Sequence, residues 1–211
     1  MSAFPVLYPV IDVDTCSTRG IDPVALAGEC LQGGARLLQL RVKERTSALF
    51  LSVADALVAA ARPYDGRIIV NDRADIALMA GAAGVHVGQD DLPVGRVRAI
   101  VGARVTIGLS THDRAQIDRA AEEDADYVAV GPVFGTASKD TGYDAVGLDL
   151  VRYAARVSRR PVVAIGGITL ERATLTLAAG AASVAVISDL LATGDASARV
   201  RDYLRALDPN A

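Results

Sequence analysis

The sequence predicts an α/β fold: a single-domain (β/α)8 barrel of the TIM type spanning residues 1–211. Short apolar runs rich in β-branched residues alternate with longer, alanine-rich amphipathic stretches. The runs are apolar throughout, as expected for parallel strands that are buried on both faces. Most of them end on a polar, charged or glycine-rich segment. Barrel enzymes assemble their sites from the carboxyl ends of such strands.

The predicted elements follow one another in strand–helix order. The strand candidates cover residues 6–11, 37–41, 68–70, 84–87, 105–109, 127–130, 162–165 and 183–187. The helix candidates cover residues 23–32, 47–62, 73–80, 94–101, 114–123, 148–157, 170–179 and 196–207. Pro23 after Asp22 fits a helix start, and Gly102 and Gly180 fit helix ends. Eight such units without a dividing linker favour a closed barrel over a doubly wound open sheet.

Composition narrows the class of protein. A net charge of −3 argues against nonspecific nucleic-acid binding, which needs a broad basic surface. We expect the two cysteines to be free thiols in a reducing cytoplasm, with Cys30 on an apolar helical position and Cys16 in a loop. Because neither a signal peptide nor a membrane-length apolar stretch is visible, we expect a cytoplasmic protein with no membrane partner.

The end of the second predicted strand carries two cations. Gln39, Arg41 and Lys43 occupy alternating positions, so their side chains should leave an extended backbone on one side. Two cations aimed together suit a polyanion such as a diphosphate, with Arg as a planar fork and Lys as a point charge. The alternative is a solvated strand end.

Carboxylates follow the next two predicted strands. Asn71 and Asp72 end the third, and Asp90 and Asp91 follow the fourth. Neighbouring carboxylates repel each other unless a cation lies between them, so the pair suggests a Mg²⁺ completed by phosphate oxygens and water. Two simpler alternatives stay open: Asp72 as a helix N-cap, and Asp90 and Asp91 as parts of a turn.

The fifth predicted strand ends on Ser110, which could donate a hydrogen bond to a phosphate or a heterocycle. No His-Asp pair lies near it, so a serine hydrolase is rejected. We expect His112 either to line the site or to cap the following helix, and we expect His86, which lies within a predicted strand, to be an interior histidine. Asp12, after the first strand, receives no role.

Glycine and hydroxyl groups follow the last three predicted strands. The loop after the sixth contains Lys139 and is polar enough for a mobile lid. Gly166 and Gly167 after the seventh strand and Ser188 after the eighth match the usual phosphate site of barrels. A second anion site beside the cationic one suggests two phosphorylated small-molecule substrates.

In this order and placement, the clusters resemble the thiamine-phosphate synthase (thiamine-phosphate pyrophosphorylase) family. The matching segments are residues 7–12, 39–43, 71–73, 84–91, 108–112, 131–139, 163–168 and 186–188. The resemblance implies a transferase, thiamine-phosphate diphosphorylase. Its reaction joins 4-amino-2-methyl-5-(diphosphooxymethyl)pyrimidine to a (carboxy)thiazole phosphate, giving thiamine phosphate and pyrophosphate. It also implies a dissociative, Mg²⁺-assisted alkyl transfer and, as a family-level expectation, a homodimer.

The resemblance also implies roles for individual residues. Those that would bind the pyrimidine diphosphate are Gln39, Leu40, Arg41, Val42, Lys43, Asn71, Ser110 and Lys139, of which Arg41, Lys43, Ser110 and Lys139 would be catalytic. Those that would hold the thiazole phosphate are Thr136, Ala137, Ser138, Gly167, Ile187 and Ser188. Asp72 and Asp91 would bind Mg²⁺.

Departures from the family pattern are few. Val42 stands where the family often has an acidic residue, and Ser138 where threonine is frequent.

The competing interpretations are a thiazole tautomerase on the same barrel, a sugar-phosphate isomerase or epimerase, and a non-catalytic phosphate-binding barrel. The first needs neither a diphosphate clamp nor Mg²⁺, the second needs a placed acid/base pair, and the third should have lost the metal carboxylates or Lys139.

Overall fold

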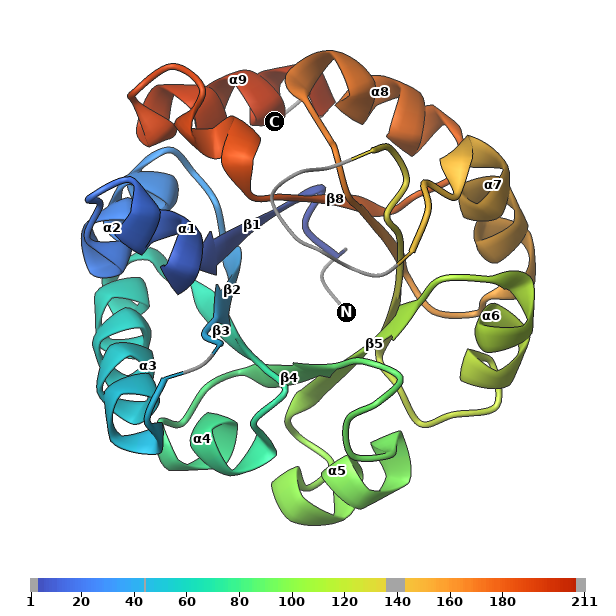
Figure 1. Ribbon diagram of the computed structural model, residues 1–211, viewed down its shortest axis with the longest axis horizontal. Helices are drawn as coiled ribbons and strands as arrows, with labels where there is room; N and C mark the ends of the chain where they lie inside the picture. The colour runs from blue at the N-terminus through green and yellow to red at the C-terminus, as the bar shows by residue number, and fades with distance from the viewer. Residues whose placement is uncertain (1–3, 44, 136–142, 208–211) are drawn as a thin grey trace.

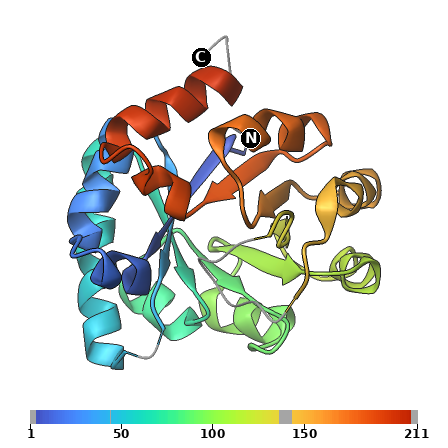
Figure 2. The same cartoon turned by 45° about the horizontal axis from the view of Figure 1, so that its top comes forward.

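Eight parallel strands close into a barrel in the order β1 to β8, and helices surround it (Figures 1 and 2). The computed structural model describes residues 4–43, 45–135 and 143–207. The predicted (β/α)8 architecture is therefore confirmed. Within the described ranges, no helix has both the length and the apolar character needed to cross a bilayer.

Strands and helices alternate from the start of the barrel to its end. The strands are β1 Leu7–Asp12, β2 Leu37–Arg41, β3 Arg67–Asn71, β4 Gly84–Val87, β5 Thr106–Thr111, β6 Tyr127–Val130, β7 Val162–Ile165 and β8 Ser183–Val186. The α-helices are α1 Val13–Thr18, α2 Pro23–Gln32, α3 Ser47–Ala61, α4 Ala74–Met79, α5 Val94–Val101, α6 Arg114–Ala120, α7 Gly147–Val157, α8 Leu170–Ala178 and α9 Ala196–Leu207. The described residues also include the 3-10 turns η1 Arg62–Tyr64 and η2 Ser188–Leu191.

Side-chain alternation along the strands divides the apolar core into two layers. Outward residues such as Leu38, Leu40 and Val70 pack beneath the helices in the larger layer. Inward residues such as Val10 and Ile69 fill the barrel in a smaller cluster. Successive residues of a strand point to opposite faces, so the polar residues at alternating positions must face the barrel interior.

Helix α1 is absent from the predicted elements. It begins at Val13 because Asp12 caps it, with the Asp12 carboxylate accepting a 2.8 Å hydrogen bond from the Thr15 amide. The expectation that Cys16 lies in a loop is wrong, because Cys16 is on this helix and only 1% exposed. Burial raises the pKa of the Cys16 thiol to about 11, so the thiol stays protonated at neutral pH.

Aromatic residues fill the interior near the amino-terminal ends of the strands. The ring centroids of Phe4 and Tyr127 lie 5.2 Å apart, and those of Tyr8 and Tyr127 lie 6.0 Å apart. The Tyr127 ring also stacks on His86. Gly108 leaves room for this pair: a Cβ added there would lie 2.1 Å from Cζ of Tyr127 and 2.5 Å from Nδ1 of His86. A glycine inside a strand is typical of such a close approach.

Gly108→Ala should therefore destabilise the barrel. We expect the free energy of unfolding to fall by about 1–3 kcal/mol, the usual cost of overpacking a filled core, as measured by urea denaturation. Gly28→Ala is the matched control, because Gly28 lies on α2 and, apart from its chain neighbours and the backbone of its own helix, no atom of the described residues lies within 4 Å of the added Cβ. Alanine favours a helix, so the control should be neutral or stabilising. Equal stabilities for the two variants would contradict this account of the interior.

Candidate active site

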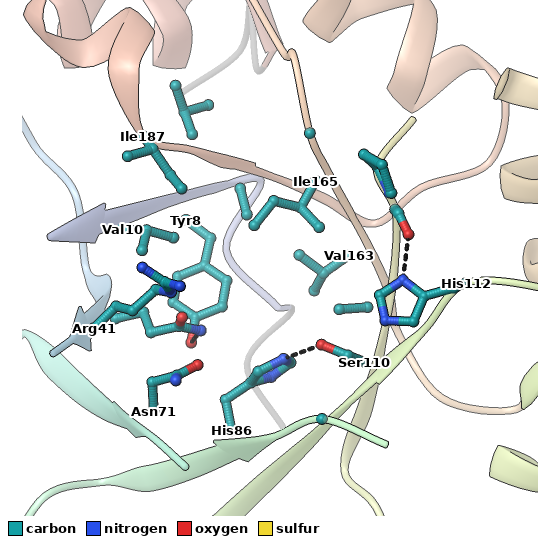
Figure 3. Close-up of a pocket in the computed structure, with 18 of the residues that line it drawn as sticks. Tyr8, Val10, Arg41, Asn71, His86, Ser110, His112, Val163, Ile165 and Ile187 are labelled. Atoms are coloured by element: carbon teal, nitrogen blue, oxygen red, sulfur yellow. Dashed lines mark hydrogen bonds between the residues drawn. The ribbon is translucent and has the colours of Figure 1, made fainter. Parts of the chain in front are cut away.

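A cavity opens at the carboxyl ends of the strands and is lined by residues from all eight of them (Figure 3). Polar side chains come mainly from β2 to β5, while β6 to β8 contribute Ala129, Val163, Ile165 and Ala185. The loops after β6, β7 and β8 add Gly131, Pro132, Gly166, Gly167 and Ser188. The cavity therefore has one side rich in charges and one built from apolar and glycine residues.

The end of β2 presents the predicted row of polar groups. Gln39, Arg41 and Lys43 all line the cavity, as their alternation requires. Leu40 and Val42 point the other way and lie in the outer core, 0% and 6% exposed. Their side chains are thus turned away from any ligand in the cavity, so only their backbone is left for the predicted contact. Nε of Arg41 is buried without a hydrogen-bond partner among the described residues.

Asp12 gains a role that the sequence left open. It is the register partner of Arg41 in the β1–β2 ladder, and the two side chains form an ion pair. The Asp12 side chain is 3% exposed, and that of Arg41 is 14% exposed. Burial acts to raise the pKa of Asp12, but hydrogen bonds from Thr15 and Arg41 outweigh it, so the pKa is lowered. Asp12 therefore remains ionised and orients the guanidinium.

The carboxylates of Asp72 and Asp91 lie beside each other on the same side of the cavity. Asp72 adopts a left-handed backbone conformation with φ of 64° and donates its amide to the His86 carbonyl at 2.7 Å. Its carboxylate forms an ion pair with Lys43. The N-cap alternative for Asp72 is wrong, because Arg73 occupies that position of α4 and no side chain caps the helix. The turn alternative holds for Asp91, which accepts the Gly88 amide at 2.7 Å.

The environment of Asp91 favours a cation or a proton. Burial raises the pKa of the Asp91 carboxyl, and the adjacent Asp72 carboxylate raises it further, against the lowering effects of the Gly88 amide and Lys43. No cluster of three or more His, Cys, Asp or Glu side chains suited to a metal occurs in the described part of the chain. Two neighbouring carboxylates suit Mg²⁺, which keeps waters and takes further oxygens from a phosphorylated ligand.

The floor of the cavity is a continuous chain of hydrogen bonds. Ser110 Oγ lies 2.8 Å from Nε2 of His86, whose Nδ1 lies 2.9 Å from the Tyr127 hydroxyl. The Tyr127 and Tyr8 hydroxyls are 3.0 Å apart, and Nε2 of Gln39 donates to Tyr8 at 3.2 Å. His86 is 7% exposed, in line with the predicted interior histidine, but it also lines the cavity.

The sequence did not predict the polar contacts of Tyr8, which lines the cavity, or of Tyr127, which hydrogen-bonds to Tyr8 and His86. Both lie in apolar runs that are typical of core, and both residues are buried, with exposures of 1% and 0%. The available signal was the alternation, because Tyr8 shares its face with Val10 and Asp12, whereas Leu7 and Ile11 face the helices.

Glycine loops after β6 and β7 pack against each other without room for side chains. Gly166 and Gly167 have φ of 101° and 60°, a region that side chains disfavour. A Cβ on Gly166 would lie 2.5 Å from Pro132, and one on Gly167 would lie 2.5 Å from the Gly135 carbonyl oxygen. The Phe134 amide donates to the Gly166 carbonyl at 3.0 Å. These contacts hold the backbone of both loops at the cavity.

Ser188 begins η2 next to this glycine-rich side. The following residue, Asp189, accepts hydrogen bonds from Arg199 at 2.7 and 3.1 Å and from the Tyr203 hydroxyl at 2.5 Å. The turn that carries Ile187 and Ser188 is thereby tied to α9, and the negative charge of Asp189 is paired away from the cavity.

His112 lines the cavity rather than capping a helix. Its Nδ1 lies 2.6 Å from the Gly131 carbonyl oxygen, and its ring stacks on Tyr143 with centroids 3.9 Å apart. Asp113 caps α6 instead, by accepting the Gln116 amide. The predicted ligands Thr136, Ala137, Ser138 and Lys139 lie outside the described residues.

Fold and cavity together define a (β/α)8-barrel enzyme with its site at the carboxyl ends of the strands. The sequence profile described as thiamine monophosphate synthase matches residues 7–190. The thiamine-phosphate synthase of Koribacter versatilis is 41% identical over 208 residues, 96% of each chain. That of Chlorobium luteolum is 41% identical over 184 residues, which is 87% of this chain and 84% of the relative.

A solved structure agrees with the sequence relatives. The thiamine phosphate pyrophosphorylase of Pyrococcus furiosus superposes with a TM-score of 0.87 at 30% identity, covering 96% of this chain and 95% of that one. The chain belongs to the thiamine monophosphate synthase family, and it is an enzyme of the transferase class.

The pairing of Asp12 with Arg41 predicts a pH-dependent contribution to stability. Asp12→Asn keeps a good N-cap for α1 but removes the charge, so at neutral pH we expect the free energy of unfolding to fall by about 2 kcal/mol. The pKa of Asp12 lies below its usual 3.8 in the folded protein. The stabilisation is thus present above that value and is lost as the pH falls through the folded-state pKa.

Urea denaturation of both proteins across the acid range checks this. The stability gap between wild type and Asp12→Asn should close in acid. A gap that stays constant down to strong acid would show that Asp12 does not stabilise the fold through its charge.

Proposed function

We propose that this enzyme joins 4-amino-2-methyl-5-(diphosphooxymethyl)pyrimidine to a thiazole phosphate, releasing pyrophosphate and forming thiamine phosphate. The observation that carries the proposal is the arrangement of the cavity. Arg41 at the end of β2 and Lys43 just after it lie beside two adjacent carboxylates after β3 and β4. The glycine loops after β6 and β7 and the turn with Ser188 after β8 lie on the other side. One side suits a metal-bound diphosphate and the other suits a phosphate monoester.

The diphosphate would lie between Arg41 and Lys43. The Arg41 side chain lines the cavity and is 14% exposed while it pairs with Asp12, which supports a contact between its guanidinium and a ligand oxygen. Lys43 is 44% exposed in its ion pair with Asp72, so its ammonium can also reach a ligand. Asn71, 6% exposed and facing the cavity, offers an amide beside them.

Asp72 and Asp91 would hold Mg²⁺ together with diphosphate oxygens and water. When bound, the ion would neutralise negative charge that grows on the departing diphosphate. The donor set supports this choice, because hard carboxylate oxygens are what Mg²⁺ takes from proteins. It also accounts for two carboxylates placed in a site for an anion, where they would otherwise repel the substrate.

The thiazole phosphate would lie against the loops after β7 and β8. The positive-φ backbone of Gly166 and Gly167 and the Ser188 hydroxyl support an anion cradle of the kind that barrels build there. The predicted contributions of Thr136, Ala137 and Ser138 stay predictions from the sequence.

The proposed reaction needs a site that stabilises the departing diphosphate more than it needs a general base. The bond between the pyrimidine methylene carbon and the diphosphate oxygen breaks, with its electron pair leaving on the diphosphate. The thiazole nitrogen then supplies its lone pair to the resulting cation. Arg41 and Lys43 would stabilise the charge on the leaving oxygen, a role also predicted for Lys139. Because the nitrogen already carries a lone pair, the site needs no strong general base.

A thiazole tautomerase on the same barrel is the second candidate. It would need neither the two cations Arg41 and Lys43 nor the carboxylates Asp72 and Asp91, and all four groups are in place here. The decisive experiment mixes the purified protein with both substrates and Mg²⁺ and measures pyrophosphate release. Pyrophosphate release that requires both substrates and Mg²⁺ supports the proposal. Equal release without the thiazole phosphate, or without Mg²⁺, would contradict it.

Asp91→Asn should raise the Mg²⁺ concentration that gives half of the maximal rate by about tenfold or more, because a carboxylate ligand is lost. A Mg²⁺ titration of pyrophosphate release measures this. Asp75→Asn is the matched control: Asp75 lies close to Asp72 in sequence but pairs with Arg73 outside the cavity. An unchanged Mg²⁺ requirement in Asp91→Asn would remove Asp91 from the metal site.

A further inference from the structure

The chain of hydrogen bonds beneath the cavity connects two residues that face the ligand. Gln39 and Ser110 both line the cavity, and Tyr8, Tyr127 and His86 join them through four contacts of 2.8 to 3.2 Å. The three linking groups are buried, with exposures of 1%, 0% and 7%. A buried hydroxyl must place its single hydrogen on one neighbour, so the direction of each bond constrains the next.

In one direction, Gln39 Nε2 donates to Tyr8, Tyr8 donates to Tyr127, and Tyr127 donates to Nδ1 of His86. A neutral imidazole then carries its hydrogen on Nε2 and donates it to Ser110. Ser110 keeps its own hydrogen for the ligand, and Gln39 offers its carbonyl oxygen. The cavity thus receives one donor and one acceptor.

Rotation of the Gln39 amide reverses every bond. Tyr8 then donates to the Gln39 carbonyl oxygen, and the hydrogens shift along the chain until Ser110 donates to Nε2 of His86. Now Gln39 offers an amide hydrogen and Ser110 offers only lone pairs. With a neutral His86, both directions give the two cavity residues opposite polarity.

We propose that Tyr8, Tyr127 and His86 are positioning residues that couple Gln39 to Ser110, so that the pair presents one hydrogen-bond donor and one acceptor to the pyrimidine ring. This rests on the proposed function, since an aminopyrimidine offers the complementary pair: an amino donor and a ring-nitrogen acceptor. A ring with two acceptors would leave one cavity acceptor facing another, which is costly in a dry site.

The interior is built to hold this chain in place. Gly108 has no side chain where one would overlap both Tyr127 and His86, and the Tyr127 ring stacks on the His86 ring with centroids 5.5 Å apart. Nε2 of Gln89 also donates to the Ser110 carbonyl at 2.6 Å, which fixes the backbone that carries the last hydroxyl.

The first test compares substrates in wild type and Tyr127→Phe, which keeps the ring and breaks the chain. The probes are the 4-amino pyrimidine diphosphate and its 4-methoxy analogue, which has acceptors only, and kcat/KM is measured from pyrophosphate release. We expect the preference for the amino compound to fall about tenfold in Tyr127→Phe, as one mispaired hydrogen bond implies. Tyr153→Phe is the control, because it loses a hydroxyl hydrogen bond to Asp118 on the outer surface.

An unchanged preference in Tyr127→Phe would overturn the coupling. If wild type releases no pyrophosphate from the amino compound, the proposed function fails instead, and a second measurement still decides the coupling. Nitrogen-15 NMR of His86 is tractable because the chain has only two histidines. Gln39→Glu makes Tyr8 a donor and should place the hydrogen of His86 on Nδ1. Tyr8→Phe leaves Tyr127 free to donate and should place it on Nε2. The same tautomer in both variants would overturn the coupling.

Discussion

The site depends on one geometric constraint: in a closed parallel barrel, alternate residues of every strand must face the interior. The constraint places Gln39 and Arg41 of β2 in the cavity and Leu40 in the apolar layer beneath the helices. The same alternation brings in Asn71 from β3 and Ser110 from β5. Groups that are far apart in the sequence meet because, in a closed barrel, the inward side chains of every strand point toward the same axis.

Charge pairing between neighbouring strands gives the cavity its electrostatic character. Asp12 on β1 pairs with Arg41 on β2, and Lys43 after β2 pairs with Asp72 after β3. Each cation is therefore held in position by a carboxylate from the adjoining strand. Two cations against Asp12, Asp72 and Asp91 leave these groups with a net negative charge, so a polyanion gains most if a divalent cation compensates Asp72 and Asp91 at the same time. This links the proposed metal to the proposed diphosphate.

Patterns that are local in sequence were enough to predict the barrel and the row from Gln39 to Lys43. The apolar runs gave the strands nearly to the residue, with β2, β4, β6 and β7 at their predicted bounds. The pairing of Asp12 with Arg41 depends on the register between two strands, which no local pattern specifies. Tyr8 and Tyr127 were missed because a phenol within an apolar run is usually core, and here each is both core and part of a polar chain.

The central claim is that the charged side of the cavity binds a diphosphate together with Mg²⁺. A crystal structure of the protein with pyrophosphate and Mg²⁺ tests it most directly. The account predicts a diphosphate between Arg41 and Lys43, and a metal ion that contacts Asp72, Asp91 and the diphosphate oxygens. A diphosphate bound only at the loops of Gly166 and Ser188, with no metal between the two carboxylates, would contradict it.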